Sequence, residues 1–258
     1  MKAIWSGSIG FGLVNIPVKL FSAIESSKLD FDMLDKKDQA NIKFKRVNEN
    51  TGKEVLWENI IKGYLFNEKY VLIDDKDFEK ASPEKTSHIE IVQFVKEHDI
   101  DSVFFESPYF IQPDKTGTRA YQLLMEALNK TGKAGLGSFV MRDREHVCLI
   151  KPYENILVLN RLRYAEEVRD PVEIKTTAGK SKPAEVKMAI SLIDQLTKPF
   201  DPGIFKDEYS EKLMKIIKAK AKGKNLAYKP MKVVHSKTAD LMEQLKASLS
   251  GGSKRKVS

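Results

Sequence analysis

Cysteine is almost absent from the 258-residue sequence, which holds only Cys148. A single cysteine excludes an intramolecular disulfide, and this usage is typical of a reducing compartment, so we expect a cytoplasmic protein. No run of about 18 apolar residues is present, which excludes an ordinary membrane-spanning helix. The apolar stretch near the N-terminus contains two glycines, Asn15 and Pro17 and is followed by no cleavage pattern, so no signal peptide is expected.

Motifs of catalytic and metal chemistry are missing as well. The four histidines stand far apart, and no His-x-x-x-His or Cys-x-x-Cys pair could seed a zinc site. The tripeptide Gly179-Lys180-Ser181 lacks the glycine that a phosphate-binding loop needs five positions earlier, where Ile174 stands. Cys148 lies between two apolar residues, which is typical of a packed strand residue rather than a nucleophile. We therefore expect no catalytic residue, no metal and no cofactor.

Positive charge is concentrated at one end of the chain. The formal net charge is +8, but residues 218–258 hold ten lysines and one arginine against two acidic residues, or +9, which leaves −1 for residues 1–217. A near-neutral body with a basic tail indicates a polyanionic partner, because lysine and arginine bind phosphates without regard to sequence. Improved solubility is the alternative explanation of the tail.

Short strands dominate the predicted secondary structure. Alternation at Val14, Ile16, Val18 and Leu20 predicts a half-buried strand, and Pro17 favours an edge position for it. The other predicted strands are residues 88–95, 102–106, 109–112, 138–142, 147–150 and 156–164. This regular spacing, with Pro, Gly and Asp between the runs, is typical of a barrel or a sandwich.

One helix interrupts the strands, at residues 118–130. Tyr121, Leu124 or Met125, and Leu128 share a face of it, and Gly132 ends it. We expect this helix to pack across the barrel. Residues 43–82 mix charges with short apolar patches and indicate an excursion from the main core.

The C-terminal third is predicted to be helical. Residues 176–183 are predicted to form a linker. A first helix is predicted at 183–197, with Val186, Ile190 and Ile193 on one face, and a second helix at 207–222. A short amphipathic helix is possible at 238–249, and residues 250–258 are predicted to be disordered.

Arginines cluster in the second half of the predicted barrel. Five of the eight lie at positions 142–169. Two pairs among them are spaced two positions apart, Arg142 with Arg144 and Arg161 with Arg163. In a strand this spacing places both guanidinium groups on one face, where they could bind phosphate oxygens. The alternative is ion pairing across strands; the candidate partners are Asp143, Glu145, Glu166 and Glu167.

Seven segments in the same order resemble bacterial Ku, the DNA-end-binding family of prokaryotic non-homologous end joining. They include WSGSIGFGLVNIPVKLF, EVLWENIIKGY, IDSVFFESPYFIQPD and MRDREHVCLIKP, and the match covers about residues 1–224. The resemblance implies a mainly β fold with α-helices: a Ku-core β-barrel whose long insertion forms half of a bridge in a homodimeric ring, followed by a helical C-terminal arm. The implied organisation is a core at 1–180 with the bridge at 43–82, a helical region at 181–223 and a basic flexible tail at 224–258.

The resemblance also implies a function and a set of contacts. Bacterial Ku is a non-enzymatic ring that threads onto ends of double-stranded DNA, protects them and recruits the ATP-dependent DNA ligase D. By analogy, DNA contacts fall to Lys43, Lys45, Arg46, Lys53, Arg142, Arg144, Arg161 and Arg163, and ligase contacts to Tyr209, Leu213 and Ile217. The chain departs from its relatives at Ser6, where a lysine is frequent, and in a tail without long Lys-Pro-Ala repeats.

Two other functional classes stay open at this point. A metal-dependent nuclease could use Asp74, Asp75, Asp77 or Asp99, although Lys76 within the cluster is more typical of a solvated turn. A general DNA-coating protein would depend on the basic tail alone.

Overall fold

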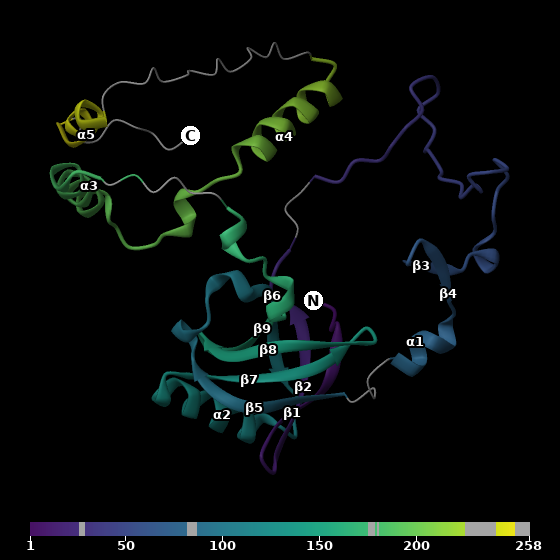
Figure 1. Cartoon of the computed structure of the whole chain (residues 1–258), viewed down its shortest axis with the longest axis horizontal. Coiled ribbons are helices and arrows are strands. Elements are labelled where there is room, and N and C mark those ends of the chain that lie inside the picture. Colours follow the sequence, from purple (N-terminus) through teal and green to yellow (C-terminus); the bar gives the residue numbers. More distant parts are fainter. Residues whose placement is uncertain (26–28, 82–86, 175–178, 180, 225–240, 251–258) are drawn as a thin grey trace. The chain divides into compact units, whose positions relative to one another are not determined.

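The computed structural model describes residues 1–25, 29–81, 87–174, 179, 181–224 and 241–250 (Figure 1). The chain divides into two compact units. Residues 1–27 and 31–171 form the first unit, and residues 28–30 and 172–258 form the second. Among the described residues, no helix is both long enough and apolar enough to cross a bilayer.

A closed barrel of seven strands forms the core of the first unit. Its strand order is β1-β2-β6-β9-β8-β7-β5, and all neighbours are antiparallel except β1 and β5, whose parallel pairing closes the barrel. The strands are β1 (Trp5–Phe11), β2 (Val14–Ser22), β5 (His88–Lys96), β6 (Phe105–Pro113), β7 (Lys133–Met141), β8 (Arg144–Tyr153) and β9 (Ile156–Leu162). The predicted mainly β fold built on a barrel is confirmed.

Strand β2 carries the predicted alternation but not the predicted edge position. Ile16, Val18 and Leu20 are buried, as expected, while β2 lies between β1 and β6. Pro17 is tolerated there because the β2–β6 ladder starts only at Val18, and the carbonyl of Pro17 accepts a hydrogen bond of 2.9 Å from the amide of Asp114. Since a closed barrel has no edge strand, the edge prediction was wrong.

Several predicted strand boundaries move. Residues Ser102–Phe104 form a 3₁₀ turn, η3, and the two strands expected at 102–106 and 109–112 are the single strand β6, which is irregular between Phe105 and Pro108. Strand β7 starts five residues earlier than expected, at Lys133. It passes very close to β5, where a Cβ on Gly137 would lie 2.0 Å from the carbonyl oxygen of Glu90. Only glycine allows this approach beside the irregularity in β5.

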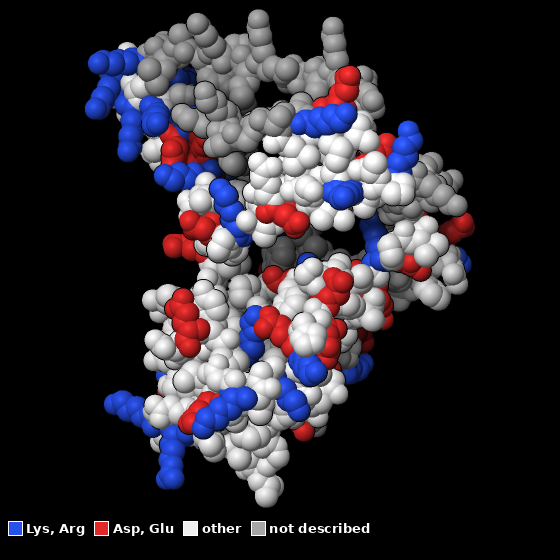
Figure 2. All heavy atoms as spheres, turned by 90° about the vertical axis from the view of Figure 1, so that its left-hand side faces the viewer, with Lys and Arg blue, Asp and Glu red and all other residues white. Residues whose placement is uncertain are grey.

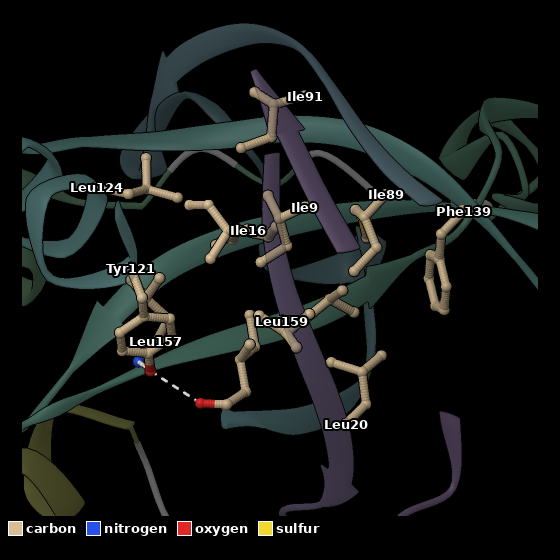
Figure 3. Close-up of a cluster of buried hydrophobic side chains, with 14 of the residues drawn as sticks. Ile9, Ile16, Leu20, Ile89, Ile91, Tyr121, Leu124, Phe139, Leu157 and Leu159 are labelled. Atoms are coloured by element: carbon tan, nitrogen blue, oxygen red, sulfur yellow. Dashed lines mark hydrogen bonds between the residues drawn. The ribbon is translucent and has the colours of Figure 1, made fainter. Parts of the chain in front are cut away.

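Helix α2 (Thr118–Thr131) packs against the barrel and contacts β2, β7 and β8. Tyr121, Leu124 and Leu128 are its buried residues, and Gly132 ends it with a φ of 63°, as the sequence predicted. The Tyr121 hydroxyl donates to the carbonyl of Ile111 at 2.8 Å and accepts from the amide of Leu157 at 2.6 Å (Figure 3). These two bonds connect α2 to strands β6 and β9 inside the apolar core.

The segment between β2 and β5, which we call the arm (residues 29–81), adds no buried residue to that core. Its elements are η1 (Trp57–Asn59), β3 (Lys62–Phe66), β4 (Lys69–Ile73) and α1 (Asp75–Ala81). Strands β3 and β4 form a hairpin, and the two turn residues Asn67 and Glu68 have φ of 47° and 64°. The arm is therefore an excursion from the core, as predicted.

Within the described residues, the second unit contains three α-helices: α3 (Pro183–Leu196), α4 (Glu208–Ala221) and α5 (Leu241–Ser250). Each lies where a helix was predicted. Helix α4 starts at an Asp207 cap, whose carboxylate accepts from the amide of Ser210 at 3.0 Å. Half of the predicted linker (residues 176–178 and 180), and residues 225–240 and 251–258 of the predicted tail, lie outside the described residues.

Candidate nucleic-acid interface

Arg142 and Arg144 do not share the face of one strand, which corrects the interpretation of their spacing. Met141 ends β7 and pairs with Arg144 at the start of β8, so Arg142 and Asp143 are the two central residues of a hairpin turn. Their φ angles of 54° and 64° identify a turn of the mirror-image type that suits the twist of β-hairpins. Both arginines are exposed at this tip, and neither forms an ion pair with a described residue.

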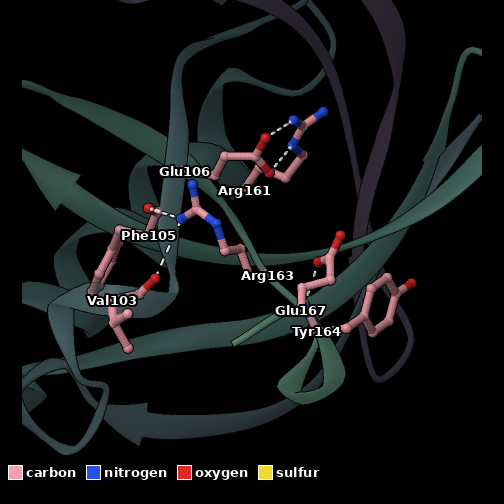
Figure 4. Close-up of polar contacts among 7 residues, drawn as sticks. All are labelled: Val103, Phe105, Glu106, Arg161, Arg163, Tyr164 and Glu167. Carbon is pink, nitrogen blue, oxygen red and sulfur yellow. Dashed lines mark hydrogen bonds and ion pairs between the residues drawn. The ribbon is translucent and has the colours of Figure 1, made fainter. Parts of the chain in front are cut away.

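Arg161 is occupied by a structural ion pair. Its guanidinium binds both carboxylate oxygens of Glu106, with Nε 2.8 Å from Oε2 (Figure 4). The two side chains are only 21% and 33% exposed, and the hydrogen bond from Arg161 lowers the pKa of the Glu106 carboxyl. Ion pairing is thus correct for Arg161, but the partner comes from β6 and is none of the four acids expected.

Arg163 is also engaged in holding the barrel together. The predicted strand to position 164 ends at Leu162, and the Arg163 guanidinium donates to the carbonyl of Phe105 at 2.6 Å and to that of Val103 at 3.3 Å (Figure 4). Carbonyl ligands leave its positive charge without a neutralising carboxylate. Arg163 therefore supports the η3–β6 junction and still adds positive potential around it.

The arm holds the other four predicted contacts. Lys45 forms an ion pair of 2.6 Å with Glu54, and the Arg46 guanidinium lies 4.6 Å from the centre of the Trp57 ring. Lys43 and Lys53 are exposed and form no ion pair with a described residue. Of the eight predicted DNA contacts, Lys45 and Arg161 have carboxylate partners, Arg46 has the Trp57 ring and Arg163 has backbone carbonyls. The side chains of the other four have no such partner among the described residues: Lys43, Lys53, Arg142 and Arg144.

The face of the molecule drawn in Figure 2 is not uniformly basic, because lysines and arginines lie among acidic side chains. Two lysines of the barrel surface, Lys19 and Lys151, form ion pairs with Asp114 and Glu97. The predicted contacts without a partner come from separate segments, the arm and the tip between β7 and β8, so a polyanion would be held by separate cations.

The aspartate cluster proposed for a nuclease has a structural role. The Asp77 amide donates to Oδ1 of Asp74 at 2.9 Å, and the Asp74 amide donates to Oδ2 of Asp77 at 3.3 Å. This reciprocal pattern caps the N-terminus of α1. Lys80 lies 3.3 Å from Asp77. In the described part of the chain, no three His, Cys, Asp or Glu side chains are grouped to hold a metal ion.

Cys148 is buried in the barrel, and burial raises the pKa of its thiol to about 12. A thiol with this pKa is almost entirely protonated at neutral pH, which disfavours nucleophilic chemistry. The expectation of a packed strand residue is confirmed.

The predicted ligase contacts differ in accessibility. Tyr209 is 74% exposed at the start of α4, whereas Leu213 and Ile217 are half-buried. Tyr209 is thus the most accessible of the three.

The hairpin of the arm is the largest feature that the residue-level prediction missed. Tyr64, Phe66 and Val71 lie on one face and Leu65, Tyr70 and Leu72 on the other, and all six are exposed. The signal was present as one run of three consecutive apolar residues (64–66) and one of four (70–73), which place apolar side chains on both faces of a two-stranded sheet. The apolar side chain of Phe78 and those of the first face also line a cavity of about 620 Å³.

Comparison with known proteins adds an independent finding. Residues 10–188 match the model of the Ku70/Ku80 beta-barrel domain. A protein of Pseudomonas aeruginosa is 39% identical over all of this chain and 92% of its own length; one of Archaeoglobus fulgidus is 38% identical over 96% of this chain and 98% of its own. A protein of Coxiella burnetii is 34% identical over 99% of this chain and 96% of its own length. Each of these relatives is named non-homologous end joining protein Ku.

Proposed function

Because this chain belongs to the Ku family, we propose that it binds ends of double-stranded DNA without sequence specificity during non-homologous end joining. Binding to any end excludes readout of base edges, so the contacts go to phosphate and sugar. Lys43, Lys53, Arg142 and Arg144 are the best candidates because their side chains are exposed and have no ion-pair, hydrogen-bond or ring partner among the described residues. The function requires no covalent step, and we assign no catalytic residue.

We further propose that two copies form a closed ring, and the observation that carries this is the apolar hairpin of the arm. An isolated two-stranded hairpin is marginally stable in water, and this one exposes large apolar side chains on both faces. Burying one such side chain contributes about 1.5–3 kcal/mol. A second copy supplies the same apolar surface in a two-fold arrangement, in which one patch contacts its equivalent.

A ring explains how a few separate cations can hold DNA. Enclosure keeps the duplex in place topologically, so a few phosphate contacts are sufficient and entry requires a free end. The C-terminal helices then recruit ATP-dependent DNA ligase D, with Tyr209 as the most accessible anchor. We place this activity in the cytoplasm, at the nucleoid.

Competition between linear and closed circular DNA of equal length tests end binding. Labelled linear duplex should be displaced by linear competitor and much less by circles, and bulky groups such as streptavidin at both ends should block loading. Equal competition by circles would point to a DNA-coating protein. Incubation of labelled ends with Mg²⁺ or Mn²⁺ should leave both strands intact, whereas shortened strands would establish a nuclease.

Sedimentation of the free protein tests the role of the hairpin in dimerisation. Leu65, 58% exposed, lies beside Tyr70 and Leu72 on one face, so Leu65→Asp should convert dimers to monomers. Asn67→Asp adds the same charge in the turn of the same hairpin and should leave the dimer intact. A wild-type monomer, or equal behaviour of the two variants, contradicts the proposed interface.

A further inference from the structure

Helix α3 has an apolar surface too wide for one neighbour to cover. Met188, Ala189 and Leu192 are half-buried along one side, whereas Val186 and Ile190 are exposed on the adjacent side. Apolar residues at spacings of three and four lie on one face of a helix, and each of the two sets forms its own face. Part of α3 is therefore already covered in the structure, and part of it is open.

The element that contacts α3 is α5, near the C-terminus. Met242, Leu245 and Leu249 are the half-buried residues of α5, at spacings of three and four. Among the described elements, α3 is the only one with which α5 makes extensive contact. The apolar face of α5 therefore lies on the half-buried face of α3.

The contact also explains why α5 is helical at all. It has ten residues, which is too short for a stable isolated helix in water. It belongs to the same chain as α3, so its docking is intramolecular and does not depend on protein concentration. Among the described elements α5 makes no other extensive contact, so its apolar face depends on α3 for burial.

We propose that α5 is a built-in occupant of a helix-docking face on α3, and that it competes with an amphipathic helix of a partner protein for this face. The partner's helix carries apolar residues at the spacing of Met242, Leu245 and Leu249, because those residues already fit there. The proposal rests on the proposed recruitment of a ligase through the C-terminal helices. It adds that recruitment is restrained by the chain's own C-terminal segment.

The test uses a fluorescent peptide of residues 238–250 added in trans to the full-length protein. Leu245→Asp places a charge in the α5 contact, and Ser248→Asp places the same charge at an exposed position of the same helix. Peptide affinity should rise about tenfold in Leu245→Asp if α5 occupies the face about nine-tenths of the time, since only the free fraction binds. It should be unchanged in Ser248→Asp.

Two further measurements make the outcome unambiguous. Amide hydrogen exchange of Pro183–Leu196 should be faster in Leu245→Asp than in Ser248→Asp, and Leu192→Asp should abolish peptide binding. The proposal is overturned if Leu245→Asp binds the peptide no more tightly than the wild type does. It is also overturned if hydrogen exchange is equal in the two α5 variants, or if Leu192→Asp still binds the peptide.

The proposed function can fail separately from this inference. Loading on DNA ends is measured on the same Leu245→Asp protein and should match the wild type. Ligase D should bind Leu245→Asp more tightly than Ser248→Asp. Loss of end binding in the wild type refutes the proposed function and leaves the peptide result standing, whereas equal ligase binding by both variants refutes competition between α5 and that partner.

Discussion

Glutamine substitutions at Arg142 and Arg161 should have opposite effects on DNA binding and on stability. Arg142 is exposed at a hairpin tip without an acidic partner among the described residues, so its charge is available to phosphate. The Arg161 guanidinium is occupied by its ion pair with Glu106. Arg142→Gln should weaken DNA binding and leave the barrel intact, and Arg161→Gln should destabilise the barrel with little effect on the salt dependence of binding.

The magnitudes follow from the contacts. Each phosphate contact contributes about 0.9 to the slope of log affinity against log salt, so loss of Arg142 from both copies of a dimer should reduce that slope by about 1.8. Arg161→Gln removes a two-bond ion pair and leaves a Glu106 carboxylate that is only 33% exposed. Allowing for solvent screening, the cost is about 1–2 kcal/mol. In a chain of this size that corresponds to a fall in Tm of about 3–6 °C.

Fluorescence anisotropy with a short labelled duplex at several salt concentrations measures the slope, and thermal unfolding measures Tm. Both variants lose one positive charge per chain, so each serves as the control for the other. An unchanged slope in Arg142→Gln refutes the assignment of that residue to DNA. A fall in slope in Arg161→Gln as large as in Arg142→Gln refutes the argument that ion-paired arginines are unavailable to phosphate.

Three more predictions concern the barrel. Tyr121→Phe removes the hydroxyl that bonds the buried amide of Leu157 and the buried carbonyl of Ile111. It should lower the free energy of unfolding, measured with denaturant, by about 2–4 kcal/mol. The control is Tyr153→Phe, whose hydroxyl makes no hydrogen bond in the described structure and whose loss should be near neutral. Burial lowers the pKa of His146, so the folded state binds fewer protons than the unfolded state and stability should fall as pH drops below about 6.5. His146→Gln should flatten this pH dependence of stability. An unchanged pH profile in the variant would contradict the role of His146. Cys148 should react with a thiol reagent only on unfolding, and rapid labelling of the native protein would show that it is accessible.

Local periodicity was sufficient for the elements whose burial depends on near neighbours in sequence. The alternation at Ile16, Val18 and Leu20 predicted the inward face of β2, and the spacing of Tyr121, Leu124 and Leu128 predicted the buried face of α2. In both cases one apolar face must leave water whatever it packs against. The spacing of the strands left a barrel or a sandwich open, and the resemblance carried by the order of the motifs selected the barrel.

Partners distant in sequence were decided only by the tertiary structure. Arg161 pairs with a carboxylate 55 positions away because β6 and β9 are antiparallel neighbours in the barrel, and the pairing of Phe105 with Leu162 places the next residue, Glu106, near Arg161. Closure by the parallel pairing of β1 and β5 removed the edge at which Pro17 was expected. Arg142 lies in a two-residue turn and Arg144 begins the next strand, although their spacing alone would fit one face of a single strand. Residue type and spacing thus determined which surfaces are apolar and which are cationic. Strand register and turn geometry determined which cations remain free, because ion pairs depend on positions in space that local sequence does not encode.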